Sequence, residues 1–183
     1  QYPIAVIVDS GCDLPDEVVD SLNIHVIPVK LNFGDVHYVD KVSLTSKEFW
    51  NELEKNPVHP QTSQPSPGDF RRQYQFLSSH YESAISIHIP EKASGTYQSA
   101  VTASKTVPKF PIEIKDSLNG SIGLGLIAMS AAEAIKKKHD FNEVSKIVDH
   151  AVENTTLFIG LKELNNVVKG GRISPKIKKV ANF

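Results

Sequence analysis

The chain has 183 residues, of which 40% are hydrophobic and 22% charged, and its formal net charge at pH 7 is −1. These values are typical of a globular protein with one well-buried domain, or with one domain and part of another. The near-neutral charge argues against a nucleic-acid-binding surface, and the single cysteine, Cys12, excludes an intrachain disulfide.

The sequence also carries signals of location. Its longest apolar stretch, 122–132, is too short to span a bilayer, and no signal peptide is visible. A lone cysteine fits a reducing compartment. We therefore expect a cytoplasmic protein without an integral membrane segment.

The first third of the chain predicts two strands and two helices. Residues 4–8 form a β-branched apolar run, which is typical of a strand buried on both faces. Pro15 suits the first turn of a helix that ends near residue 22, with Asp13 as its cap. A second strand is predicted over 24–33, where Pro28 favours an edge or a bulge. Thr45 and Glu48 then have capping-box spacing for a helix over 45–55.

Four prolines make 56–67 a predicted loop, and the segment Ser66-Pro67-Gly68-Asp69 supplies an N-cap, a first-turn proline and an acidic first turn for a helix to about residue 79. From there strand and helix patterns alternate. We expect later strands at 84–89, 112–114 and 155–159, and later helices at 96–107, 121–138 and 141–152.

This alternation predicts an α/β fold with a mainly parallel sheet covered by helices. We expect one domain over 1–154 and the beginning of a second, incomplete α/β domain over 155–183. Ligands of such sheets bind beyond the carboxyl ends of the strands. The pairs Asp9-Ser10, Ser94-Gly95 and Asp116-Ser117 follow predicted strands, so they are expected at one edge of the sheet.

Hydroxyl groups, exposed backbone amides and a guanidinium are what a small anion needs from a protein. Three clusters carry them: Gln61-Thr62-Ser63-Gln64-Pro65-Ser66, Ala93-Ser94-Gly95-Thr96-Tyr97 and Gly170-Gly171-Arg172-Ile173-Ser174. Each also has a purely structural interpretation, because the hydroxyls could cap helices, the paired glycines could end one, and Arg172 could form an ion pair.

Catalytic and metal-binding signatures are weak by comparison. There is no Walker loop, no nucleophile elbow and no close pair of His or Cys ligands, and no spacing favours a Ser-His-Asp triad. The glycines at 120, 123 and 125 do not have dinucleotide-binding spacing, and close helix packing explains them better. We expect no resident cofactor and no metal.

Taken in order, five motifs resemble the DegV family of bacterial fatty-acid-binding proteins. They are Val8-Asp9-Ser10-Gly11-Cys12-Asp13-Leu14-Pro15, Thr62-Ser63-Gln64-Pro65-Ser66, Ser94-Gly95-Thr96-Tyr97-Gln98-Ser99-Ala100, Asp116-Ser117 and Lys169-Gly170-Gly171-Arg172-Ile173-Ser174. Some members of that family are the lipid-carrying subunit of a two-part fatty acid kinase, and family members are usually longer than this chain.

The resemblance implies a non-catalytic carrier of a long-chain fatty acid, presented to a separate kinase subunit. It implies that Thr62 and Ser94 bond the carboxylate, with Ser63, Gly95 and Thr96 close by and Arg172 near the headgroup. The acyl chain would run into an apolar tunnel between two domains. At the same sheet edge we expect Asp9, Ser10 and Ser117 to support the site.

Two other functions stay open at this point. One is a phosphotransferase or hydrolase that acts through Asp9, Ser10 or Ser94. The other is an interaction module whose basic face is formed by Lys169, Arg172, Lys176, Lys178 and Lys179.

Overall fold

A computed structural model describes residues 3–161 and 164–173 of the chain. Its internal contacts divide it into two compact units, and each is described by itself. Of the described residues, the first unit combines 3–29 with 64–157, and the second combines 30–63 with 158–161 and 164–173. The second unit therefore contains an early segment, 30–63, that the predicted boundary at 154 assigned to the first domain.

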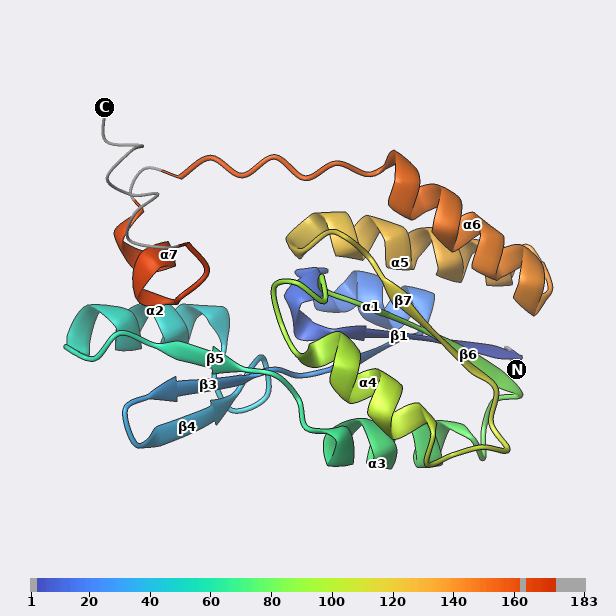
Figure 1. Cartoon of the computed structure of the whole chain (residues 1–183), viewed down its shortest axis with the longest axis horizontal. Coiled ribbons are helices and arrows are strands. Elements are labelled where there is room, and N and C mark those ends of the chain that lie inside the picture. Colours follow the sequence, from blue (N-terminus) through green and yellow to red (C-terminus); the bar gives the residue numbers. More distant parts are fainter. Residues whose placement is uncertain (1–2, 162–163, 174–183) are drawn as a thin grey trace. The chain divides into compact units, whose positions relative to one another are not determined.

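The first unit is built on a four-stranded parallel sheet. Its strands are β1 (Ile4–Asp9), β2 (Ile24–Ile27), β6 (Ser83–His88) and β7 (Ile112–Asp116), in the order β2-β1-β6-β7 (Figure 1). Every residue of β1 and β6 is buried, as expected for the central strands of a sheet covered on both faces. The predicted mainly parallel sheet is confirmed.

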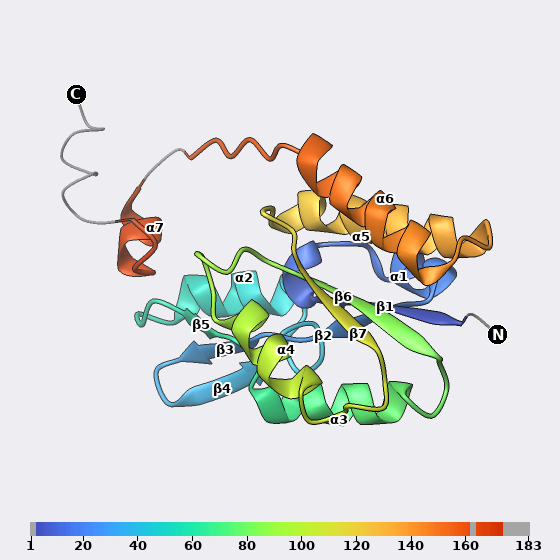
Figure 2. The same cartoon turned by 45° about the vertical axis from the view of Figure 1, so that its right-hand side comes forward.

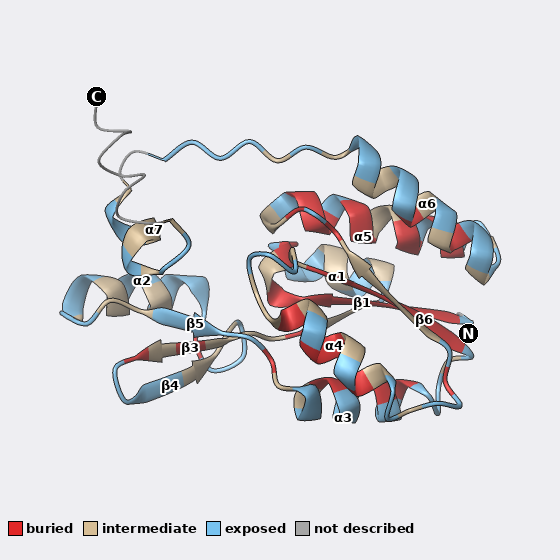
Figure 3. Cartoon of the chain, viewed as in Figure 1, coloured by how far each residue is buried: buried red, intermediate tan, exposed pale blue. Residues whose placement is uncertain are grey.

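Helices cover both faces of this sheet (Figure 2). One face packs against α1 (Asp16–Leu22) and α5 (Ser121–Lys136), and α6 (Phe141–Asn154) packs on α5. The other face packs against α3 (Pro67–Leu77) and α4 (Thr96–Ser104). Alternate side chains of each strand enter the two cores, because successive residues of a strand point to opposite faces. Burial is accordingly concentrated on β1, β6 and the inner sides of the helices (Figure 3).

Local signals predicted two helix starts correctly and one incorrectly. A capping box forms at Thr45 with Glu48, as predicted, and Ser66 is the predicted N-cap of α3, where it also forms a capping box with Asp69. Asp13 does not cap α1, whose N-cap is Pro15 without a side-chain bond. Asp13 instead ends a short 3-10 turn, Ser10–Cys12, in the left-handed conformation with φ 49°, which an aspartate tolerates better than most residues.

The second unit contains a three-stranded antiparallel sheet. Its strands are β3 (Lys30–Phe33), β4 (Val36–Val39) and β5 (Gln61–Ser63), in the order β4-β3-β5. The helix α2 (Ser46–Lys55) contributes side chains that pack on the core of Leu31, Phe33 and Leu44. The short helix α7 (Asn165–Lys169) also belongs to this unit.

The strand predictions need four corrections. The predicted strand 24–33 is two strands in different sheets, β2 and β3, because the chain breaks at Pro28, which cannot donate a ladder bond. The predicted loop 56–67 contains β5, and β4 was not predicted. The predicted strand 155–159 is absent, since residues 155–161 have no regular structure and Phe158 is 90% exposed. That the chain after 155 begins a second α/β domain stays a prediction.

None of the helices in the described part of the chain is both long and apolar enough to cross a bilayer.

Candidate functional site

The carboxyl edge of the parallel sheet gathers the ends of three strands. Asp9 ends β1, His88 ends β6 and Asp116 ends β7. The strand register pairs His88 with Asp116. It also pairs Val8 with Ile87, the residues that directly precede Asp9 and His88. The predicted placement of Asp9-Ser10 and Asp116-Ser117 at one edge is therefore confirmed, and the loop from β6 toward Ser94 leaves from the same edge.

Asp9 holds two chain segments together at this edge. Its fully buried carboxylate accepts the Gly11 N–H at 3.0 Å and the Ile89 N–H at 3.0 Å. His88 Nδ1 lies 3.1 Å from the same Oδ2 that binds Ile89. The Asp9 carboxylate thus bonds both to the turn after β1 and to the loop after β6.

A chain of hydrogen bonds continues from Asp9 into the core beneath α3. His88 Nε2 lies 2.7 Å from Ser86 Oγ, which lies 2.9 Å from the Tyr74 hydroxyl. All four side chains are fully buried, and we call Tyr74, Ser86, His88 and Asp9 the buried polar chain. Burial raises the pKa of Tyr74, so the phenol keeps its proton.

The sequence reasoning missed this arrangement, although a signal was present. Ser86 and His88 alternate along β6 with the apolar residues Ile85 and Ile87, so both polar side chains point to one face. The structure does bring a serine, a histidine and an aspartate into hydrogen-bond order, contrary to the expectation from spacing. Because Ser86 is wholly buried, this order does not present a nucleophile to a substrate.

The predicted hydroxyls of the first unit meet at the start of α4. Ser94 is half-buried, and its Oγ lies 2.9 Å from Thr96 Oγ1 and accepts the Thr96 N–H at 3.3 Å. Gly95 is the N-cap residue and makes no side-chain cap. A Cβ at Gly95 would lie 2.6 Å from Gln64 Nε2, so the glycine lets Gln64, the residue after Ser63, lie directly on this turn.

The predicted groups of the second unit also meet. Thr62 and Ser63 are exposed on β5, and Arg172 Nη2 donates to Thr62 Oγ1 at 3.2 Å. Arg172 Nη1 donates to the carbonyl of Gly170, and Gly171 has φ +75°, a conformation that favours glycine. Within the described residues Arg172 has no carboxylate partner, so the ion pair considered from the sequence is not found there.

Comparison with known proteins identifies the family of this chain. The sequence model of a family described as "Uncharacterised protein, DegV family" matches residues 3–183. A DegV domain-containing protein of Staphylococcus aureus is 39% identical over 169 residues, which cover 92% of this chain and 60% of the relative. The chain belongs to the DegV family.

Two solved structures of DegV proteins share the fold at more than 25% identity. DegV of Bacillus subtilis, named a fatty acid binding protein, superimposes with a TM-score of 0.79 at 31% identity, over 84% of this chain and 55% of its own. The fatty acid kinase B3 protein of Streptococcus pneumoniae, solved with linoleic acid, gives 0.83 at 26% identity, over 97% and 64%. This DegV chain thus spans about 55–64% of the length of the relatives described here.

The structure gives the two supporting serines of this DegV chain a structural role. Ser10 Oγ accepts the Val29 N–H at 3.0 Å, and Ser10 is 1% exposed. Ser117 is fully buried, donates to the Asn119 carbonyl at 2.5 Å and accepts the Asn119 N–H at 3.2 Å. Both hydroxyls are therefore engaged in stabilising loops at the sheet edge.

Close packing explains Gly123 and Gly125 of α5 in this DegV chain, as predicted, but not Gly120, whose Cβ would meet no atom within 4 Å. A Cβ at Gly125 would lie 2.8 Å from the Cys12 carbonyl oxygen, and one at Gly123 would lie 2.9 Å from Asn119 Oδ1. Across residues 3–161 and 164–173 no group of three or more His, Cys, Asp or Glu side chains could hold a metal ion. Ser174 and the basic residues Lys176, Lys178 and Lys179 lie outside the described residues.

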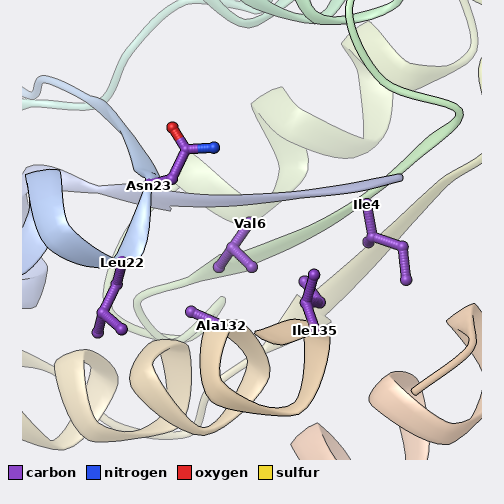
Figure 4. A pocket seen from close by; sticks show the side chains of 6 residues that line it. All are labelled: Ile4, Val6, Leu22, Asn23, Ala132 and Ile135. Carbon is purple, nitrogen blue, oxygen red and sulfur yellow. The ribbon is translucent and has the colours of Figure 1, made fainter. Parts of the chain in front are cut away.

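A small pocket lies at the opposite end of β1 from this edge (Figure 4). It has a volume of about 200 Å³, which includes space open to solvent, and is lined by Ile4, Val6, Leu22, Asn23, Ala132 and Ile135. Ligands of parallel sheets bind beyond the carboxyl ends of the strands. The position of this pocket at the other end of β1 makes it a poor candidate for the site.

Proposed function

We propose that this chain is part of a carrier that holds a long-chain fatty acid by its carboxylate and presents it to a separate kinase subunit. The observation that carries the proposal is the bond from Arg172 to Thr62, which joins a guanidinium and a hydroxyl that are 110 residues apart in sequence. The names of the Bacillus subtilis and Streptococcus pneumoniae relatives support the ligand, and the latter's name supports a kinase partner.

The chemistry of these groups suits a carboxylate. A guanidinium binds the two oxygens of a carboxylate through parallel N–H bonds, and such charge-assisted bonds are among the stronger ones in proteins. Thr62 and Ser63 are exposed and can add hydroxyl donors. Ser94 supplies a half-buried hydroxyl, which the fully buried Thr96 contacts at 2.9 Å. Gly95 and Thr96 form the amino-terminal end of α4, where backbone N–H groups favour an anion.

The competing catalytic function has less support. Asp9 and Ser10 are buried and already bonded to backbone amides, so neither is placed to attack or to accept a phosphoryl group. Ser94 has Thr96 rather than a base as its hydroxyl partner. We therefore assign phosphoryl transfer to the separate kinase subunit, propose that this chain works without a resident cofactor or metal, and place it in the cytoplasm.

Lipid analysis of the purified chain tests the proposal. The chain would be produced in bacteria, and its solvent extract analysed by mass spectrometry beside a mock purification. We expect a fatty acid in the extract of the chain and not in the control. If the extract contains none, and the chain also fails to bind a fluorescent fatty acid, the carrier function is wrong.

A further inference from the structure

The proposed fatty acid binding does not assign a role to the buried polar chain. Tyr74, Ser86, His88 and Asp9 are fully buried, and burying polar groups is unfavourable unless each finds a partner. Among the described residues none of the buried side-chain polar atoms lacks a hydrogen-bond partner. These four side chains therefore form a network in which every polar atom has a partner.

Counting donors and acceptors assigns the protons of this network. Asp9 already accepts two backbone N–H groups, so its carboxylate acts as an acceptor and His88 donates from Nδ1. Nε2 of a neutral imidazole then accepts from Ser86, which accepts from the Tyr74 hydroxyl. In this order each of the three side-chain protons has an acceptor.

The network ends on the loop that leads to the candidate site. Asp9 accepts the Ile89 N–H. Two residues further along the loop, the Glu91 N–H donates to Asp116 Oδ2 at 3.2 Å. The His88 carbonyl accepts the Ser117 N–H at 3.0 Å. The first residues of the loop 89–95 are thus bound to the ends of β1 and β7, and the loop then delivers Ser94 to the start of α4.

We propose that His88 is a positioning residue: its Nδ1–H orients the Asp9 carboxylate, which holds the loop 89–95 and so places Ser94, Gly95 and Thr96. Its effect on the ligand rests on the proposed function, whereas its effect on the loop does not. Ser86 and Tyr74 extend this control, because they fix the imidazole from its other nitrogen.

Amide hydrogen exchange of the whole chain tests the proposal directly. In His88→Leu the carboxylate loses its side-chain donor, and we expect exchange at 89–96 to become at least about tenfold faster, as for the loss of one hydrogen bond to a charged group. His88→Asn keeps a donor near the position of Nδ1 and should restore most of the protection. Ile85→Val is the matched control, because Ile85 is an equally buried residue of β6 on the opposite face.

Two results would overturn the proposal. One is a folded His88→Leu variant whose loop exchanges as slowly as in the wild type. The other is equal loop opening in Ile85→Val, which would make the effect a general loss of core stability. If His88→Leu does not fold, Ser86→Ala decides, since it removes the hydroxyl that joins His88 Nε2 to Tyr74 and leaves the contact of Nδ1 with Asp9 in place. Unchanged loop exchange in that variant also contradicts the proposal.

Ligand binding separates this inference from the proposed function. The affinity for oleic acid, measured by displacement of a fluorescent fatty acid, should fall about tenfold in His88→Leu and recover in His88→Asn. Displacement by methyl oleate, which has no carboxylate, should not change. If the loop opens in His88→Leu and the affinity for oleic acid does not change, the carboxylate does not bind near Ser94. If the wild-type chain binds no fatty acid, the carrier function is refuted and the hydrogen-exchange result remains valid.

Discussion

At the scale of single residues, the candidate site consists of small groups whose geometry depends on one or two contacts each. Arg172 is placed by bonds to Thr62 and Gly170, and Ser94 by its bonds with Thr96. Thr62 is exposed, so its hydroxyl contributes little to packing. We propose that its contact with Arg172 serves ligand binding.

The hydroxyls Thr62 and Ser94 should matter more for lipid binding than for the fold. A hydrogen bond to a charged group contributes about 1.5–3 kcal/mol, so Thr62→Ala and Ser94→Ala should each lower fatty acid affinity roughly ten- to a hundredfold. Loss of a neutral hydrogen bond costs about 0.5–1.5 kcal/mol of stability, which bounds the effect on unfolding. Titration with a fluorescent fatty acid and urea unfolding measure the two quantities. Normal binding together with much lower stability would show that both hydroxyls serve only the fold.

Gly95 and Gln64 should be coupled. The Cβ of Gly95→Ala would approach Gln64 Nε2 to 2.6 Å, and the backbone at Gly95, with φ −72°, accepts an alanine without strain. We expect Gly95→Ala to destabilise the chain and Gln64→Ala to relieve that loss in the double variant. A cycle of unfolding free energies should show an interaction of about 0.5–3 kcal/mol. Additive effects would mean that Gln64 moves away freely.

At the scale of elements, local hydrogen bonds fix the start of α2. The capping box of α2 joins Thr45 and Glu48 through three hydrogen bonds: the Glu48 carboxylate accepts the N–H and the hydroxyl of Thr45, and the Thr45 hydroxyl accepts the Glu48 N–H. The backbone N–H of Thr45, and then its hydroxyl, lower the pKa of Glu48. This cap therefore depends on pH.

A lowered carboxyl pKa contributes stability above the pKa of the unfolded chain, and that contribution is lost as the pH falls through the lowered folded value. The stability difference between wild type and Glu48→Gln should be present at pH 7 and disappear below the lowered pKa of Glu48. Urea unfolding across pH 3–7 measures it, with Glu54→Gln on the same helix as the control. A difference that does not change with pH would exclude the charge of Glu48 as its source.

The elements also show what could be predicted from the sequence. The apolar run of β1 and the capping signals at Thr45 and Ser66 are local, and the structure confirms them. The division of 24–33 between two sheets depends on distant partners, since β3 pairs with β4 and β5 rather than with β1. The run 155–159 has strand composition but no partner strand among the described residues, so propensity alone was misleading.

The residues of the candidate site could also not be predicted from local sequence signals alone. Its residues were named from a family resemblance, because no spacing rule connects Thr62 with Arg172. His88 was missed, because a histidine at the end of a strand does not reveal whether it is buried or which carboxylate it meets. Asp13 was assigned to the wrong cap, since the 3-10 turn before it was not predicted.

At the scale of the whole molecule, the chain has two compact units and spans 60% of its Staphylococcus aureus relative. Phosphoryl transfer is assigned to another protein, so the chain with ATP and fatty acid should form no acyl phosphate. Acyl phosphate should appear when a bacterial fatty acid kinase subunit is added, as detected by mass spectrometry after hydroxylamine trapping. Product formed by this chain with ATP alone would overturn the carrier function in favour of an enzyme.

The central claim is that the chain holds a fatty acid by its carboxylate, and headgroup discrimination tests it most directly. The wild-type chain, loaded with a fluorescent fatty acid, would be titrated with oleic acid and with methyl oleate, which share one acyl chain. We expect oleic acid to bind at least about tenfold more tightly, with the advantage lost in Thr62→Ala, because only the acid offers a charged acceptor. Equal displacement by the two ligands would contradict recognition through the carboxylate.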